Sequence, residues 1–110
     1  VEDESLQSNA RKMGEKLKSG LKKLQKKYES IGDVRGMGLF VGIELIDENG
    51  KENTRLCTFV KNRMRDFRIL IGSEGPMDNV LKIRPPLSIE LEGINMIIDT
   101  LDAILEEETI

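Results

Sequence analysis

Apolar residues recur every three or four positions over residues 1–30 of the chain. They are Leu6, Ala10, Met13, Leu17, Leu21, Leu24 and Tyr28. Because an α-helix turns once in about 3.6 residues, this spacing places the apolar side chains on one stripe. The pattern therefore predicts an amphipathic helix over 5–30, and Gly32 with its neighbours is expected to end it.

Apolar and polar positions alternate from residue 34 to residue 46. Leu39, Val41, Ile43 and Leu45 form the apolar set, and Phe40, Gly42 and Glu44 stand between them. A period of two with β-branched residues predicts one strand over 34–46, largely buried on one face. Residues 47–50 then supply a turn, because Asn-Gly tolerates the positive φ that such turns need.

The second half of the chain contains shorter elements. Helical spacing predicts a helix over 54–67, and short apolar runs predict strands over 68–71 and 80–83. The pair Pro85-Pro86 stops the second strand, because proline has no N–H to donate to a ladder. A last amphipathic helix is expected over 88–107.

This order of elements predicts an α+β fold. We expect a two-layer sandwich in which helices cover one face of a small, mainly antiparallel sheet. A chain of 110 residues is long enough for one hydrophobic core and too short for two, so we expect a single domain over 1–110. The chain begins with Val1 instead of methionine, which favours a piece of a longer protein.

Composition narrows the possible chemistry and partners. The 17 basic and 20 acidic side chains nearly balance, so we expect no nucleic-acid partner. No stretch approaches the roughly 18 apolar residues of a membrane-spanning helix, so we expect no membrane partner. The absence of histidine excludes Ser–His and Cys–His pairs and histidine metal sites, and we expect no metal. The one cysteine, Cys57, fits an intracellular, reducing compartment, mitochondrial or cytoplasmic.

Two glycine motifs have a functional and a structural interpretation. The spacing Gly36-x-Gly38-x-x-x-Gly42 is similar to a dinucleotide-binding loop, but that loop needs a helix after the glycines. Here a predicted strand follows, which favours a bend or a close backbone approach. Gly72 and Gly75 favour a tight loop between strands over a phosphate cradle, because Glu74 lies between them.

Lysines crowd the second half of the first predicted helix. They are Lys16, Lys18, Lys22, Lys23, Lys26 and Lys27. Such a face either attracts a polyanion or is solvated and complemented by the acidic last helix. Aromatic residues are not interleaved with these lysines, which favours the solvated face.

Arg84 is the one candidate for ligand contact that the residues alone single out. It stands at the end of a predicted strand, directly before Pro85-Pro86. A guanidinium held there can bind a carboxylate through two parallel hydrogen bonds, or pair with a neighbouring acid of the chain. No complete catalytic constellation is visible beside it, so composition and spacing do not define a function.

Two blocks resemble one enzyme family. The run Val34-Arg35-Gly36-Met37-Gly38-Leu39-Phe40-Val41-Gly42-Ile43-Glu44-Leu45 resembles the R-G-x-G-L-(x)-x-G-I-E-L segment of class III pyridoxal-phosphate aminotransferases, in their C-terminal small domain. The run Leu81-Lys82-Ile83-Arg84-Pro85-Pro86-Leu87 resembles the strand and P-P-L turn before the last helix of that domain. Residues 71–76 and 79–83 are similar to one branch, the alanine–glyoxylate aminotransferase 2-like proteins, which include ethanolamine-phosphate and phosphohydroxylysine phospho-lyases.

This resemblance implies the small domain of a fold type I enzyme that uses pyridoxal 5'-phosphate. The lysine that binds the cofactor would belong to a large domain outside this chain, so no cofactor-binding or catalytic residue is assigned here. Arg84 is implied to lie near the substrate or in a salt bridge that orients the domain, and we favour the position near the substrate. Arg35 and Glu44 are implied to be structural. Glu90 departs from the usual threonine cap of the last helix, and Gly93 weakens its first turn.

The expected function is therefore that of a C-terminal domain in a transaminase or phospho-lyase. Implied partners are the large cofactor-binding domain of the same protein, a small amine or amino acid, phosphorylated in the phospho-lyase branch, and a second copy in a homodimer. The 110-residue chain alone is expected to be inactive. The alternative is a free-standing α+β binding or assembly domain without catalysis.

Overall fold

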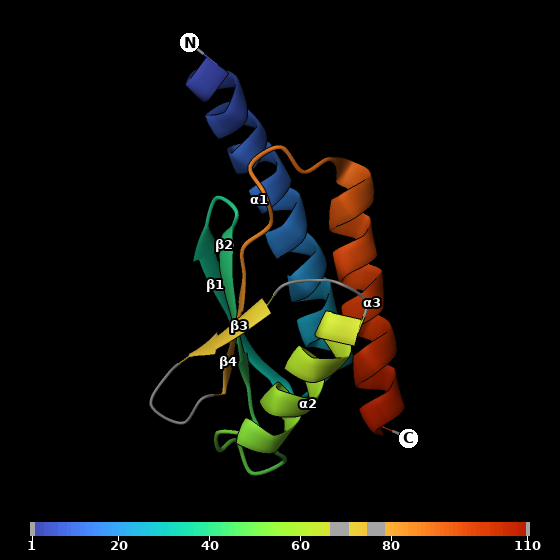
Figure 1. Cartoon of the computed structure of the whole chain (residues 1–110). Coiled ribbons are helices and arrows are strands. Elements are labelled where there is room, and N and C mark those ends of the chain that lie inside the picture. The colour runs from blue at the N-terminus through green and yellow to red at the C-terminus, as the bar shows by residue number, and fades with distance from the viewer. Residues whose placement is uncertain (1, 67–70, 75–78, 110) are drawn as a thin grey trace.

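A computed structural model describes residues 2–66, 71–74 and 79–109. Its elements are α1 (Glu2–Lys27), β1 (Ile31–Met37), β2 (Phe40–Leu45), α2 (Thr54–Asp66), β3 (Ile71–Glu74), β4 (Val80–Ile83) and α3 (Leu91–Thr109). The strands form one antiparallel sheet in the order β1-β2-β4-β3 (Figure 1). None of the helices in these residues is long and apolar enough to cross a membrane.

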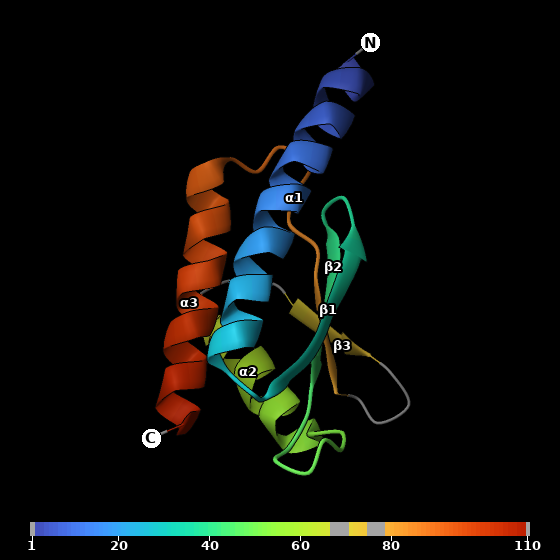
Figure 2. The same cartoon turned by 180° about the vertical axis from the view of Figure 1, so that it is seen from behind.

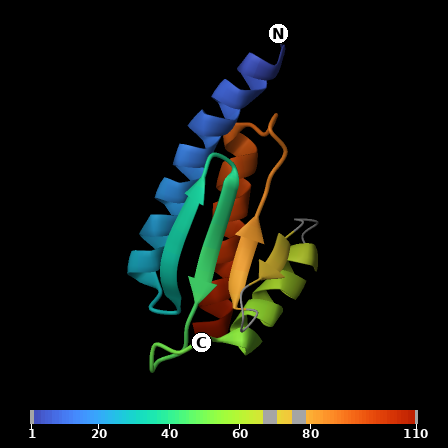
Figure 3. The ribbon, with the colours of Figure 1, turned by 90° about the vertical axis from the view of Figure 1, so that its left-hand side faces the viewer.

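The helices form one layer and the sheet forms the other. Figure 3 shows the sheet in front with α1 and α3 behind it, and Figure 2 shows the helix layer from the opposite side to Figure 1. Side chains of β2 and β4 alternate between the two faces, so Val41, Ile43, Leu81 and Ile83 are buried against the helices. The predicted α+β two-layer sandwich with an antiparallel sheet is confirmed.

A single hydrophobic core lies between the layers. The helices contribute mainly residues at helical spacing, which are Leu17, Leu21, Leu24, Leu56, Val60, Met64, Ile94, Ile97, Leu101, Ile104 and Leu105. Cys57 is buried with them. Full burial of one such aliphatic side chain stabilises the fold by roughly 1.5–3 kcal/mol. The spacing along α1 and α3 therefore explains how α1 packs on β1 and β2 while α3 packs on α1 and α2.

Asn79 fixes how β4 pairs with β2. Its side chain is 3% exposed, and its amide Nδ2 donates a hydrogen bond to the carbonyl of Leu45 at 3.0 Å. The amide of Leu45 in turn donates to the carbonyl of Asn79 at 2.9 Å. A shifted strand register would break these bonds and leave the buried Asn79 amide without partners. An unpaired buried amide costs free energy, so the observed register is favoured.

The prediction of one strand over 34–46 is wrong, because this segment is a β-hairpin. β1 and β2 are antiparallel, with Met37 opposite Phe40 and a turn at residues 38–39. Gly38 has φ +57, a conformation that glycine adopts without steric cost. Leu39 is buried in this turn, so the apolar alternation continues through it and hides the reversal.

Several predicted boundaries also differ from the structure. The first helix ends at Lys27, and residues 31–33, expected to terminate it, belong to β1 because they pair with β2. Residues 72–74, expected in a loop, belong to β3 and pair with β4. The predicted strand over 68–71 falls mostly on 68–70, and the predicted helix 54–67 ends on residue 67, positions outside the described residues.

The last helix begins at Leu91 instead of residue 88. Residues 87–88 form a turn, in which the amide of Ile89 donates to the carbonyl of Pro86 at 3.0 Å. The carbonyl of Glu90 accepts the first helical bond, from Ile94 at 3.1 Å. The stiff Pro85-Pro86 pair and this turn delay the helix by three residues relative to the prediction.

Two glycines allow the hairpin turn to touch α1. A Cβ built on Gly14 would lie 2.1 Å from the carbonyl oxygen of Gly38, so only glycine permits this approach. Lys18 of α1 also donates from Nζ to the carbonyl of Gly36 at 3.2 Å. These contacts attach the tip of the hairpin to the middle of the helix, which confirms the expected role of the glycines in close backbone approach.

Gly14→Ala is expected to lower the free energy of unfolding by roughly 1–3 kcal/mol, because the new methyl group meets main-chain atoms. This loss exceeds the gain of about 1 kcal/mol that alanine brings to a helix interior. Gly20→Ala is the matched control, since its Cβ meets the Ile98 Cδ1 atom at 2.2 Å, the end of a side chain that can rotate. Urea unfolding of both variants measures the difference, and equal stabilities would contradict the close contact.

Candidate functional site

The face of the sheet that points away from the helices carries the candidate site. We call it the outer face, and its residues are Arg35, Met37, Phe40, Gly42, Glu44, Val80, Lys82 and Arg84. This face is toward the viewer in Figure 3. Met37 is 87% and Phe40 is 42% exposed, although both are large apolar side chains. Exposed apolar groups among cations are typical of a surface that contacts a partner or ligand.

The structure places Arg84 directly after β4, at the outer face. Val41 pairs with Ile83, so the next residue on each strand puts Phe40 beside Arg84. The Cζ atom of Arg84 lies 5.1 Å from the centre of the Phe40 ring, a cation–π distance. Among the side chains that the structure describes, those of residues 5–66 and 79–108, Arg84 forms no ion pair with a carboxylate. Pairing of Arg84 with a neighbouring acid of the chain is thus not seen among these side chains.

Arg35, on β1 at the edge of the sheet, has different contacts from Arg84. Its guanidinium lies 2.9 Å from the Asp33 carboxylate and 3.8 Å from that of Glu44. These pairs link β1 to β2 across the outer face, in keeping with the structural role implied for Arg35 and Glu44. Arg35 thus differs from Arg84 in having carboxylate partners within the chain.

Phe40 was not predicted as part of this site. Lys82 Nζ lies 4.8 Å from the ring centre. Phe40 therefore contacts two cations, Lys82 on β4 and Arg84 directly after it. The available signal was an aromatic residue at a polar position of the alternating pattern. Its partners could not be inferred, because they depend on the pairing of strands that are far apart in the sequence.

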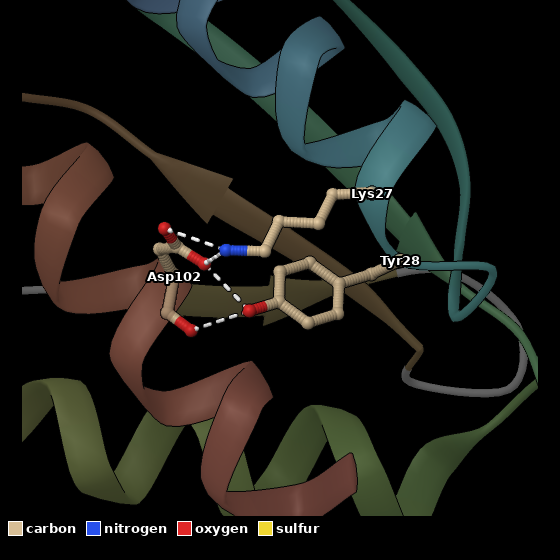
Figure 4. A network of polar contacts seen from close by, with 3 residues as sticks. All are labelled: Lys27, Tyr28 and Asp102. Atoms are coloured by element: carbon tan, nitrogen blue, oxygen red, sulfur yellow. Dashed lines mark hydrogen bonds and ion pairs between the residues drawn. The ribbon is translucent and has the colours of Figure 1, made fainter.

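A second polar cluster joins α1 to α3 (Figure 4). The Tyr28 hydroxyl lies 2.5 Å from Asp102 Oδ1 and 3.0 Å from the Asp102 carbonyl, and it can donate to either. Lys27 Nζ donates to both carboxylate oxygens of Asp102, at 3.0 and 3.3 Å. The cluster connects the last turn of α1 with the middle of α3.

These contacts shift the pKa values of the cluster. The hydrogen bond from Tyr28, with Lys27 adding to it, lowers the pKa of the Asp102 carboxyl below its ordinary value of 3.8. Burial, followed by the bond to Asp102, raises the pKa of the Tyr28 hydroxyl. The Asp102 carboxylate therefore stays ionised and bonded to its neighbours, which suits a link between helices and not a proton-transfer group.

The acidic last helix is complemented by bases on both of its neighbours. Besides Lys27 on α1, Arg55 and Arg63 of α2 reach it, at 2.6 Å from Glu108 and 2.7 Å from Glu107. The lysines Lys22, Lys23 and Lys26 on α1 are exposed to solvent. This arrangement agrees with the solvated face complemented by the last helix, the interpretation that the sequence favours.

Pyridoxal phosphate does not fit the residues of this chain. An enzyme binds it through a lysine held in an enclosed, polar site, and none of the lysines in the described residues is buried. Two grooves on the helix layer are open to solvent and are bordered mainly by side chains of α1 and α3. No group of His, Cys, Asp or Glu in the part of the chain that is described could hold a metal ion.

Comparison with known proteins identifies the family. Residues 1–105 match the family model described as Aminotransferase class-III. Over 109 residues the chain is 42% identical to ethanolamine-phosphate phospho-lyase homolog 1 of Caenorhabditis elegans, covering 96% of this chain and 23% of the relative. It is 37% identical to the alanine–glyoxylate aminotransferase 2-like protein of Drosophila melanogaster, covering 97% of this chain and 23% of that protein.

A solved structure has the same fold. A phospholyase from Arthrobacter in complex with phosphoethanolamine superposes with a TM-score of 0.89 and 33% identity, covering 96% of this chain and 25% of that one. The chain thus spans about a quarter of the length of the relatives it matches.

Asp102→Asn tests the link between α1 and α3. We expect it to lower the free energy of unfolding by about 1 kcal/mol at neutral pH, because the bonds to a charged acceptor are lost. A lowered pKa in the folded state means stability that is present above pH 3.8 and lost as the pH falls through the folded value. The difference between the two proteins in urea unfolding should therefore shrink below about pH 4. A difference independent of pH would show that the charge of Asp102 has no part in it.

Proposed function

The chain belongs to the class III aminotransferase family, and on this basis we propose that it is the C-terminal domain of a pyridoxal-phosphate-dependent transaminase or phospho-lyase. The fold match to the Arthrobacter phospholyase, over 96% of this chain, is the observation that carries the proposal. The substrate is a small amine or amino acid. A phosphorylated amine is favoured, because the names of the C. elegans relative and of the Arthrobacter structure both contain one.

The outer face is the surface that docks on the cofactor-binding domain of the same protein. The helices occupy the opposite face of the sheet, whereas Met37 and Phe40 leave apolar area exposed on this one. The relatives are about four times as long as this chain, so a large domain is available to cover that area. A second copy of the whole enzyme, as the family resemblance implies, completes a homodimer.

Arg84 is the substrate-proximal residue of this domain. It is exposed on the docking face and makes no ion pair with the described carboxylates, so its guanidinium is available to an anionic group. A planar guanidinium can bind a carboxylate or phosphate through two parallel hydrogen bonds. Arg84 thus orients the anionic end of the substrate, while the reacting amine lies toward the other domain.

The chain contributes binding and orientation to the reaction. When bound to the large domain, pyridoxal phosphate supplies the electron sink, and the protein around it supplies position and electrostatics. Docking of the outer face excludes water from Arg84 and Phe40, which strengthens any ion pair formed there. Because the described lysines are not placed to bind the cofactor, the 110-residue chain alone is inactive.

The first test is the mass and cofactor content of the native protein. We expect a polypeptide several times longer than this chain, with the visible absorbance of pyridoxal phosphate fixed to a lysine by borohydride. Mass spectrometry of the purified protein and an absorbance spectrum measure both properties. A native chain of 12.4 kDa without cofactor would instead support a free-standing binding domain.

Arg84→Gln in the full-length protein is expected to raise KM for phosphoethanolamine about tenfold or more, with a smaller change in kcat. The physical reason is the loss of a charge-assisted pair, worth roughly 1.5–3 kcal/mol. Arg35→Gln is the matched control, since Arg35 is an arginine on the same face with internal partners, and its KM should change less than about twofold. Equal effects of the two substitutions would sink the assignment of Arg84.

A further inference from the structure

Phe40 is an exposed aromatic residue whose ring contacts two cations. It lies on the outer face, 42% exposed, with Arg84 Cζ at 5.1 Å and Lys82 Nζ at 4.8 Å from the ring centre. The Phe40 side chain gains no stabilisation from burial in the hydrophobic core, because it points to the face of the sheet away from the core. Its contacts with the two cations are the interactions that its position makes possible.

The strand register places these three side chains together. Val41 pairs with Ile83 and Gly42 with Lys82, so Phe40 lies next to Arg84 and diagonal to Lys82 on the same face. Gly42, opposite Lys82, carries no side chain to separate the lysine from the ring. A Cβ there would be in ordinary van der Waals contact with the Val80 Cγ1 atom at 3.5 Å, so the side chain of Val80 borders this position.

The backbone at Arg84 is restricted as well. Arg84 precedes Pro85, and the residue before a proline is confined to extended conformations. The main chain thus fixes where the side chain starts, and the ring of Phe40 contacts the guanidinium where it ends. An arginine on an exposed strand end otherwise samples many rotamers, and ordering them on binding costs free energy.

We propose that Phe40 is a positioning residue that holds the Arg84 guanidinium on the outer face, ready for the anionic group of the substrate. The ring attracts the cation without neutralising it, which an acidic partner such as those of Arg35 would do. Phe40 thereby reduces the entropy that binding costs and leaves the charge available. This proposal rests on the proposed function of Arg84 for its consequence, but the contact itself can be tested independently.

The contact is measured by NMR on the 110-residue chain. The ring current of Phe40 should shift the δ-methylene protons of Arg84 upfield, and Phe40→Leu should return them toward the random-coil position. Phe40→Tyr keeps the ring and should keep the shift. If the Arg84 resonances do not move in Phe40→Leu, the ring does not hold the guanidinium and the proposal is overturned, whatever the parent enzyme does.

The consequence is measured as a double-mutant cycle in the full-length protein, with phosphoethanolamine as substrate. Phe40→Leu should raise KM about two- to fivefold, equivalent to ~0.5–1 kcal/mol, with kcat nearly unchanged. The same substitution in an Arg84→Gln background should have no further effect on KM, because there is no guanidinium left for Phe40 to position. In a Lys82→Gln background the effect should persist, which separates the two cations.

The outcomes distinguish this inference from the proposed function. A KM effect of Phe40→Leu that is equally large without Arg84 would overturn the positioning role and leave the role of Arg84 intact. No effect of Arg84→Gln itself would refute the proposed contact with substrate, while the NMR shift would still decide whether Phe40 orders the side chain. Rescue by Phe40→Tyr in both measurements supports the ring, and not mere bulk, as the cause.

Discussion

The hydrogen bonds between Asn79 and Leu45 are the constraint on which the rest of this domain depends. They set β4 against β2, and a shift by one residue would turn every side chain of β4 to the other face. In the observed register, Leu81 and Ile83 enter the core and Lys82 and Arg84 stay outside. The carbonyl of Leu45 also accepts from the amide of Asn53, directly before α2. The hydrogen bonds of Leu45 thus hold both the register of β4, which sets the core and the outer face, and the start of α2.

The helix layer and the outer face of the sheet carry different kinds of contacts. The apolar stripes of α1 and α3 supply the core, and Asp102 with Tyr28 ties the two helices at one end. Arg55 and Arg63 of α2 form ion pairs with Glu108 and Glu107 near the end of α3. On the opposite side of the sheet no described helix packs, and Arg84 lies beside the exposed ring of Phe40. The hydrophobic core and the exposed cation–aromatic cluster therefore lie on opposite faces of a single sheet.

Sequence patterns predicted the parts of this fold that depend on local spacing. The helices and β4 follow from apolar periodicity, and Arg84 stood out because two prolines follow it. The hairpin was missed, since the buried Leu39 continues the alternation through the turn at Gly38. The contacts of Phe40 with Arg84, and of Tyr28 with Asp102, join residues distant in sequence. Such pairs depend on strand register and helix packing, which a single sequence does not display.

The burial of Cys57 determines the thiol chemistry of the domain. Its side chain is fully inaccessible within the core, on the face of α2 that packs inward. Oxidants and alkylating reagents therefore reach the sulfur only when α2 separates from its neighbours. Since no other cysteine exists in the chain, cross-linking between copies through disulfides requires the same opening. While the fold is intact, Cys57 does not react with thiol reagents. The rate at which its sulfur is modified therefore measures how often the core opens.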